Sequence, residues 1–84
     1  MTAGESVSTY LDELAEQRRQ SPHTVSNYRR DLSVLGELAG HTPLARIESH
    51  QVRRFVAHLH ARGLRGRSLA RTLSAWRGFY RWLF

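Results

Sequence analysis

Apolar residues recur at the spacing of an α-helix along nearly the whole chain, and no segment alternates apolar and polar residues as a half-buried strand does. Four segments carry such an apolar stripe, at residues 5–19, 22–40, 49–63 and 67–84. Because 84 residues leave room for only one hydrophobic core, these helices must pack against one another. We therefore predict a single all-α domain of four helices that covers the whole chain.

Capping and turn residues separate the four segments. Ser21 followed by Pro22 predicts the start of the second helix. A serine N-cap accepts hydrogen bonds from the free amides of the first turn, and proline fits the first helical position because an N–H there would have no partner within the helix. Ser49 predicts the N-cap of the third helix, and Gly63 predicts its left-handed C-terminal cap. Residues 41–48 contain a Thr-Pro pair and are expected to form a loop.

The last helix has two opposite faces. At about 100° per residue, one arc is apolar and is predicted to enter the core: Leu69, Leu73, Trp76, Phe79, Tyr80 and Leu83. The opposite arc combines arginines with small residues: Arg67, Ala70, Arg71, Ser74, Arg77, Gly78 and Arg81. The pairs Arg67–Arg71 and Arg77–Arg81 place like charges four residues apart, which destabilises an isolated helix. Local stability therefore does not explain this face, whereas an external anion does.

The charge distribution supports the same reading. All 13 basic residues are arginine, the net charge is +6, and no acid follows Glu48. A basic surface of this kind attracts polyanions. Other arginines lie near acids in the sequence and are expected to be solvated or paired: Arg18 and Arg19 near Glu16, and Arg29 near Asp31 and Glu37.

Nucleic acid is the partner that this pattern favours. Arginine binds phosphates and guanine edges bidentately, and short polar side chains let a helix approach the groove closely. The last helix offers Arg67, Arg71, Ser74 and Arg77. We predict direct contact for the three arginines because the second half of the chain has no nearby acid to pair with them. A second, weaker surface is expected on the second helix, at His23, Ser26, Asn27 and Arg30.

Other functions find little support. The five histidines lack the spacing of metal ligands, cysteine is absent, and the three tyrosines lie on apolar stripes, where core packing explains them. We therefore expect no catalytic residue, metal or cofactor in this chain. No signal peptide or apolar run long enough to cross a membrane is present, which predicts a soluble, cytoplasmic protein without a membrane partner.

The order of several short motifs resembles the opening of the Xer-type tyrosine recombinases. The first group comprises Thr9-Tyr10-Leu11 and residues 16–24 and 27–32; the second comprises Arg62-Gly63-Leu64 and residues 68–83. The resemblance implies an orthogonal, SAM-like bundle, the core-binding domain whose second and fourth helices contact double-stranded DNA. Carried over by position, it favours Thr24, Asn27 and Arg30 together with Arg67, Ser68, Arg71, Ser74 and Arg77. Thr24 and Ser68 enter through the resemblance alone.

The resemblance also implies what this chain lacks. In that family the nucleophilic tyrosine and its arginine and histidine partners belong to a C-terminal catalytic domain, so Tyr10, Tyr28 and Tyr80 are not expected to be nucleophiles. We expect this chain to be a fragment, monomeric in isolation, of a recombinase that assembles with homologous subunits on DNA. Chromosome dimer resolution at cell division is the implied role.

Two alternatives remain open from the residues alone. The arginine face could dock an acidic partner protein, which a competition between duplex DNA and an acidic peptide would reveal. The chain could also be a small transcription regulator of the helix-turn-helix type, which would require a stable dimer and palindromic sites.

Overall fold

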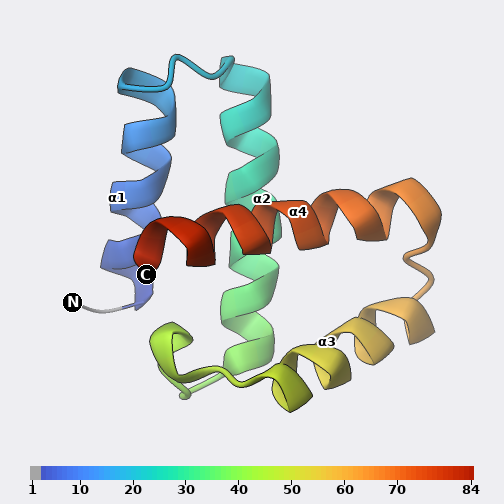
Figure 1. Cartoon of the computed structure of the whole chain (residues 1–84). Coiled ribbons are helices and arrows are strands. Elements are labelled where there is room, and N and C mark those ends of the chain that lie inside the picture. The colour runs from blue at the N-terminus through green and yellow to red at the C-terminus, as the bar shows by residue number, and fades with distance from the viewer. Residues whose placement is uncertain (1–2) are drawn as a thin grey trace.

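A computed structural model describes residues 3–84, which form four α-helices and one 3-10 turn (Figure 1). No strand occurs in this described part of the chain, so the predicted all-α fold is confirmed. The elements are α1 (Ala3–Glu16), α2 (Pro22–Ala39), the turn η1 (Leu44–Arg46), α3 (Ser49–Ala61) and α4 (Gly66–Leu83).

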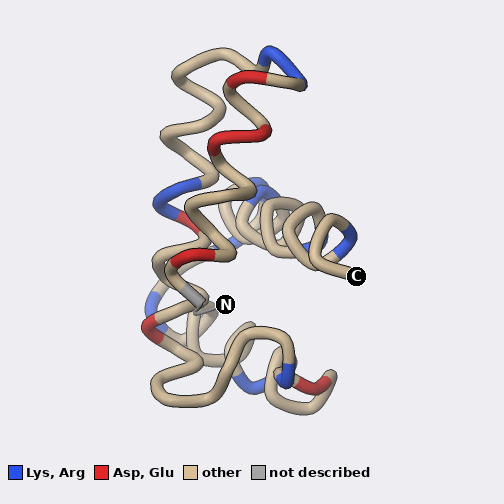
Figure 2. Tube along the Cα trace, turned by 90° about the vertical axis from the view of Figure 1, so that its left-hand side faces the viewer, with Lys and Arg blue, Asp and Glu red and all other residues tan. Residues whose placement is uncertain are grey.

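The helices form two layers. The first two, α1 and α2, lie side by side and antiparallel, and α4 crosses both of them at a steep angle (Figure 1). Seen from the side, α4 projects from one face of the α1–α2 pair, while α3 lies near the C-terminal end of α2 (Figure 2). The crossing places α4 against the middle of α2.

Local signals set most helix ends. The Ser21 side chain accepts a hydrogen bond from the Thr24 amide at 3.1 Å, with proline at the first helical position as predicted. Gly63 adopts a φ of 102°, the left-handed geometry expected after α3. The predicted cap at Ser49 is wrong by one residue, because Glu48 caps α3 through a reciprocal box with Gln51.

The first helix ends earlier than predicted. It stops at Glu16 rather than at residue 19, because the chain turns there: Arg19 has a φ of 52°, and the Arg18 amide donates to the Glu13 carbonyl at 3.1 Å. This turn directs Arg18 away from the path that a longer helix would have given it.

Aromatic residues of α4 fill the core between the layers. The largest fully buried side chains are Tyr10, Leu32, Leu35 and Phe79, and the Tyr10 and Phe79 rings meet edge to face at 5.7 Å. Tyr80 donates a hydrogen bond to the Leu44 carbonyl at 2.7 Å, which ties α4 to the turn η1. Burial raises the pKa of Tyr80 to about 12.

Candidate nucleic-acid interface

The outward face of α4 carries its arginines as predicted. The exposed residues of α4 are Gly66, Arg67, Ser68, Ala70, Arg71, Ser74, Arg77 and Arg81. The buried face is rotated from the predicted one, since Thr72 and Ala75 are buried while Leu69 and Leu73 are only partly so. Thr72 is on the side of α4 that faces α2, since its hydroxyl lies 3.3 Å from Asp31 Oδ1.

A buried carboxylate joins α2 to α4. The Thr72 hydroxyl lies 3.3 Å from Asp31 Oδ1 and 3.0 Å from the Ser68 carbonyl, so it donates to one of the two at a time. The Trp76 indole N–H donates to the Asp31 carbonyl at 2.8 Å. These contacts fix how α4 rotates on α2, and therefore which of its residues face outward.

Asp31 also contradicts part of the sequence argument. Arg71 Nε lies 3.7 Å from Asp31 Oδ2, so the prediction that Arg71 has no acidic partner is wrong. Asp31 was expected at the surface near Arg29, but its side chain is buried and directed at α4. Within the described residues, no carboxylate forms an ion pair with Arg67, Arg77 or Arg81.

The predicted residues of α2 lie beside α4. Thr24 and Asn27 are half-buried, and they precede Asp31 by about two turns and one turn of the helix, respectively, on the α4-facing side. The Thr24 hydroxyl oxygen lies 2.9 Å from that of Ser21. Arg30 is exposed and donates to the Asn27 side-chain carbonyl, which holds the guanidinium next to the amide.

Two hollows flank the crossing of α2 and α4. The first, of about 310 Å³, lies between α1, α2 and α4 and includes the predicted Ser74 and Arg77. The second, of about 340 Å³, brings together the predicted Arg30, Ser68 and Arg71. Thr24, Asn27 and Arg67 line neither hollow. Arg62 in the second hollow, and Arg18 and Arg81 in the first, are basic residues that the prediction did not include.

Acidic and basic residues are concentrated on different helices. Acidic positions follow α1, whereas every charged residue on α4 is an arginine (Figure 2). The exposed groups along α4 and the facing part of α2 are therefore cations, hydroxyls and an amide. These groups donate hydrogen bonds to anions and to base edges.

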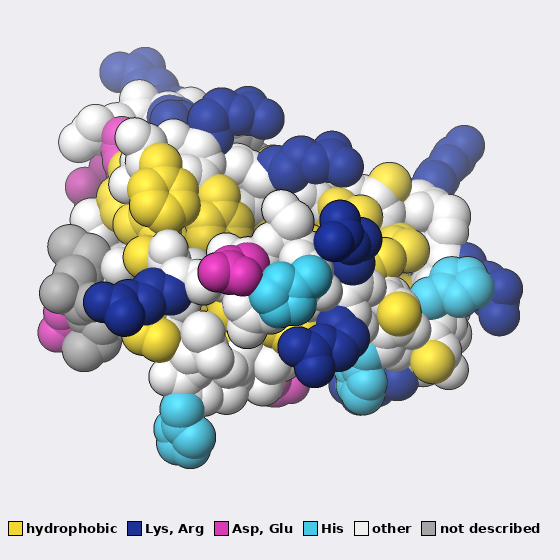
Figure 3. Space-filling view, turned by 60° about the horizontal axis from the view of Figure 1, so that its bottom comes forward, with side chains coloured by type: hydrophobic (Ala, Val, Ile, Leu, Met, Phe, Trp, Pro, Cys, Tyr) yellow, Lys and Arg dark blue, Asp and Glu magenta, His cyan; other side chains and the backbone are white. Residues whose placement is uncertain are grey.

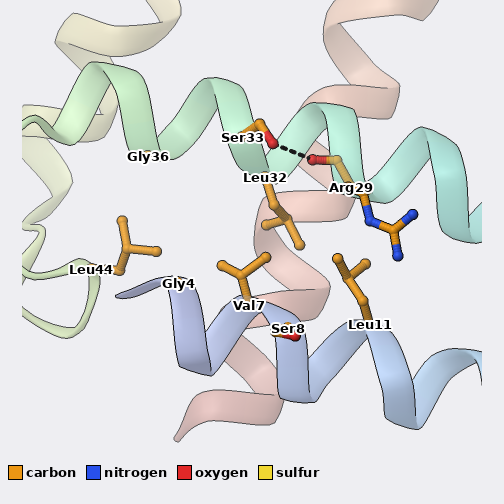
Figure 4. A pocket seen from close by; sticks show the side chains of 9 residues that line it. All are labelled: Gly4, Val7, Ser8, Leu11, Arg29, Leu32, Ser33, Gly36 and Leu44. Atoms are coloured by element: carbon orange, nitrogen blue, oxygen red, sulfur yellow. Dashed lines mark hydrogen bonds between the residues drawn. The ribbon is translucent and has the colours of Figure 1, made fainter. Parts of the chain in front are cut away.

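The remaining hollows have different chemistry. One of about 310 Å³ lies between α1 and α2, where Val7, Leu11, Leu32 and Leu44 make an apolar lining and Arg29 is the single charged residue (Figure 4). A wider groove of about 840 Å³ runs between α3 and α4. On that side of the molecule, hydrophobic side chains reach the surface between basic ones (Figure 3).

Two kinds of feature are absent from the part of the chain that the structure describes. No group of three histidines, cysteines or acids is placed to hold a metal ion there. None of the helices in residues 3–84 combines the length and the apolar character needed to cross a bilayer.

Residues 7–84 match the family model of the phage integrase, N-terminal SAM-like domain. The tyrosine recombinase XerC of Ralstonia pickettii (strain 12J) is 47% identical over 81 residues, which are 92% of this chain and 25% of that protein. Tyrosine recombinase XerC 1 of Ralstonia nicotianae is 48% identical over 81 residues, with the same shares of 92% and 25%. The XerC of Alcanivorax borkumensis is 42% identical over 79 residues, covering 94% of this chain and 26% of its own.

The chain thus spans about a quarter of the length of the curated relatives it matches. No solved structure matches it significantly. The resemblance stated from the motifs and the expected SAM-like fold are both confirmed. Because the family model matches nearly all of its residues, this chain belongs to the family of phage integrase N-terminal SAM-like domains.

Proposed function

We propose that this chain binds double-stranded DNA as the N-terminal module of a site-specific tyrosine recombinase. The observation that carries the proposal is the row of exposed arginines on α4, three of which form no ion pair with a carboxylate of the described chain. The family membership and the names of the relatives support the recombinase context.

In this proposal α4 lies along the duplex with α2 beside it. Small residues at Ala70 and Ser74 let the helix backbone come close to the DNA, while the arginines reach phosphates or guanine edges. Asn27 and Arg30 extend the contact from α2. Thr24 and Ser68 lie in the first turns of α2 and α4, and in this proposal their hydroxyls contact phosphates.

The whole protein would supply what this module does not. We assign the strand-exchange chemistry to a catalytic part outside these residues, and the role to chromosome dimer resolution with homologous recombinase subunits as partners. The support for this assignment is the likeness to XerC recombinases over a quarter of their length. A cytoplasmic location and a monomeric state of the isolated module stay predictions.

The salt dependence of duplex binding tests the proposal. If about five arginines each neutralise a phosphate, the logarithm of the affinity should fall against the logarithm of salt with a slope of about −4 to −5. Non-specific affinity should be around 10⁻⁴ to 10⁻⁶ M at physiological salt. A slope near zero, or equal binding of an acidic peptide at the same ionic strength, would contradict DNA binding.

Amide chemical-shift mapping with a short duplex locates the surface. We expect perturbations along α2 and α4, centred on the outward arginines. Perturbations confined to α1 and α3 would assign the contact to another face and refute the interface described above.

A further inference from the structure

Three arginines from two parts of the chain converge on the hollow between α1, α2 and α4. Arg77 and Arg81 come from the outward face of α4, and Arg18 comes from the turn that follows α1. No carboxylate is among the residues that line this hollow. Three like charges around one concave surface repel one another, so the arrangement is unfavourable until an anion occupies it.

Hydroxyl groups complete the lining. Tyr10, Tyr28 and Ser74 each contribute a side chain to the wall of the hollow. The Tyr10 hydroxyl lies directly over Gly78, where a Cβ atom would come within 2.8 Å of its oxygen. Glycine at this position is therefore what lets a buried tyrosine of α1 bring its hydroxyl to the surface of α4.

The charge state of Tyr10 makes it a hydrogen-bond donor. Burial is the largest cause that raises its pKa, followed by the neighbouring Tyr28, and Glu13 adds to the effect; Arg18 and Arg81 lower it. The net direction is upward, so the hydroxyl keeps its proton at neutral pH. Glu13, the acid near this site, accepts a hydrogen bond from the Trp82 indole N–H and is not among the residues that line the hollow.

We propose that this hollow binds one phosphate group of the DNA backbone, held by Arg18, Arg77 and Arg81 and by the Tyr10 and Ser74 hydroxyls. Planar guanidinium groups bind the two free oxygens of a phosphodiester in pairs. A phosphate held here would fix the position of α4 along the duplex and bring the end of α1 onto the DNA. The proposal rests on the proposed function, and it adds Arg18, Arg81 and Tyr10 to the contact set.

The test compares the salt slope of duplex binding among variants. The variants are Arg18→Gln, Arg81→Gln and the double replacement, and Arg54→Gln is the matched control because Arg54 is exposed on α3 away from the hollows described. Since Arg18, Arg77 and Arg81 serve one phosphate, the double variant should lower the slope by no more than about 0.9. A fall of about 1.8 would show that Arg18 and Arg81 contact separate phosphates, and it would overturn the proposal. A double variant with the slope of the control would overturn the proposal.

Tyr10→Phe tests the hydroxyl by itself. It should weaken duplex binding by roughly tenfold, the loss of a hydrogen bond to a charged group, while the salt slope stays unchanged. Circular dichroism and thermal unfolding of the variant confirm that the fold is retained. A Tyr10→Phe variant that is folded and binds as the wild type does would remove Tyr10 from the site.

Inorganic phosphate serves as the second probe. Amide shifts at Tyr10 and Gly78 on phosphate addition, lost in the double arginine variant, would support an anion site. If these shifts occur but the arginine variants keep the full salt slope on DNA, the site serves a free phosphate and the DNA assignment is wrong. A wild-type slope near zero instead refutes the proposed function itself, so the two failures are distinguishable.

Discussion

Arg71 on α4 and Asp31 on α2 form an unequal ion pair: the guanidinium is about half exposed, the carboxylate is buried, and Nε lies 3.7 Å from Oδ2. The same Oδ2 atom has no hydrogen-bond partner among the described residues. Arg71 thus provides the nearest positive charge to a buried carboxylate. This pair distinguishes Arg71 from Arg67, which lies one turn away on the same face.

The first prediction follows from this difference. Arg71→Ala should lower the free energy of unfolding by about 1 kcal/mol, because it removes the charge that stabilises a buried carboxylate, reduced by solvent screening of the exposed guanidinium. Arg67→Ala should leave stability within about 0.5 kcal/mol. Urea unfolding at neutral pH measures both. Equal stability of the two variants would mean that the ion pair contributes nothing.

Arg71→Ala also tests whether Arg71 contacts DNA. Arg71→Ala should weaken duplex binding by about 1–3 kcal/mol and relax specificity if Arg71 contacts a base, or weaken all sequences equally if it contacts phosphate. Competition binding with a specific and a scrambled duplex tells these apart. Unchanged affinity would remove Arg71 from the interface.

The second prediction concerns the contact between Tyr10 and Gly78. Replacing a glycine inside a helix by alanine normally stabilises it by about 0.5–1 kcal/mol. Here the new Cβ would lie 2.8 Å from the Tyr10 hydroxyl oxygen, and that ring is fully buried and cannot move freely. Gly78→Ala should therefore destabilise the fold by about 1–3 kcal/mol.

A double-mutant cycle checks the cause of that loss. In the Tyr10→Phe background the nearest ring atom is 4.0 Å from the new Cβ, an ordinary contact, so Gly78→Ala should no longer be destabilising. Thermal unfolding of the four proteins gives the coupling energy. If Gly78→Ala destabilises both backgrounds equally, the hydroxyl is not the cause.

These contacts show where sequence reasoning stops. The Ser21 cap, the Gly63 turn and the outward arginines of α4 are local patterns, and each was predictable from nearby residues. The Asp31 partnership joins residues 41 positions apart at Thr72, so it depends on how α4 crosses α2. The spacing of apolar residues within either helix does not determine the angle at which α4 crosses α2.

The approach of Arg18 to α4 has a similar origin. The periodic pattern continues α1 to residue 19, but the chain leaves the helix at Glu16 and turns through a positive φ at Arg19. This turn, together with the helix crossing, brings Arg18 to the hollow that Arg77 and Arg81 line. Neither event is encoded in a stripe of apolar residues, so the convergence was not predictable.

The third prediction uses the raised pKa of Tyr80. An unfolded tyrosine titrates near pH 10, whereas the folded pKa is about 12. Its contribution to stability is complete below pH 10 and is lost as pH rises toward 12, because only the unfolded chain can ionise in this window. The loss should reach about 1–2 kcal/mol after allowance for partial exposure.

Tyr80→Phe provides the comparison for this pH effect. The variant loses the hydrogen bond to the Leu44 carbonyl and should be less stable at pH 8 by about 1 kcal/mol. Between pH 10 and pH 12 its unfolding free energy should fall less steeply than that of the wild type. Parallel curves over this range would show that another group causes the alkaline loss.

The fourth prediction compares two adjacent arginines of α2. Arg30 lines the hollow that Ser68 and Arg71 of α4 also line, whereas Arg29 lines the apolar hollow between α1 and α2 (Figure 4). Both are exposed and carry the same charge, so they contribute equally to net charge.

If the duplex contacts the crossing of α2 and α4, Arg30→Ala should weaken binding about tenfold and lower the salt slope by about 0.9, while Arg29→Ala stays close to wild type. Fluorescence anisotropy with a labelled duplex over a range of salt measures both quantities. Equal losses for the two variants would show that long-range attraction by net charge, rather than a located interface, accounts for the binding.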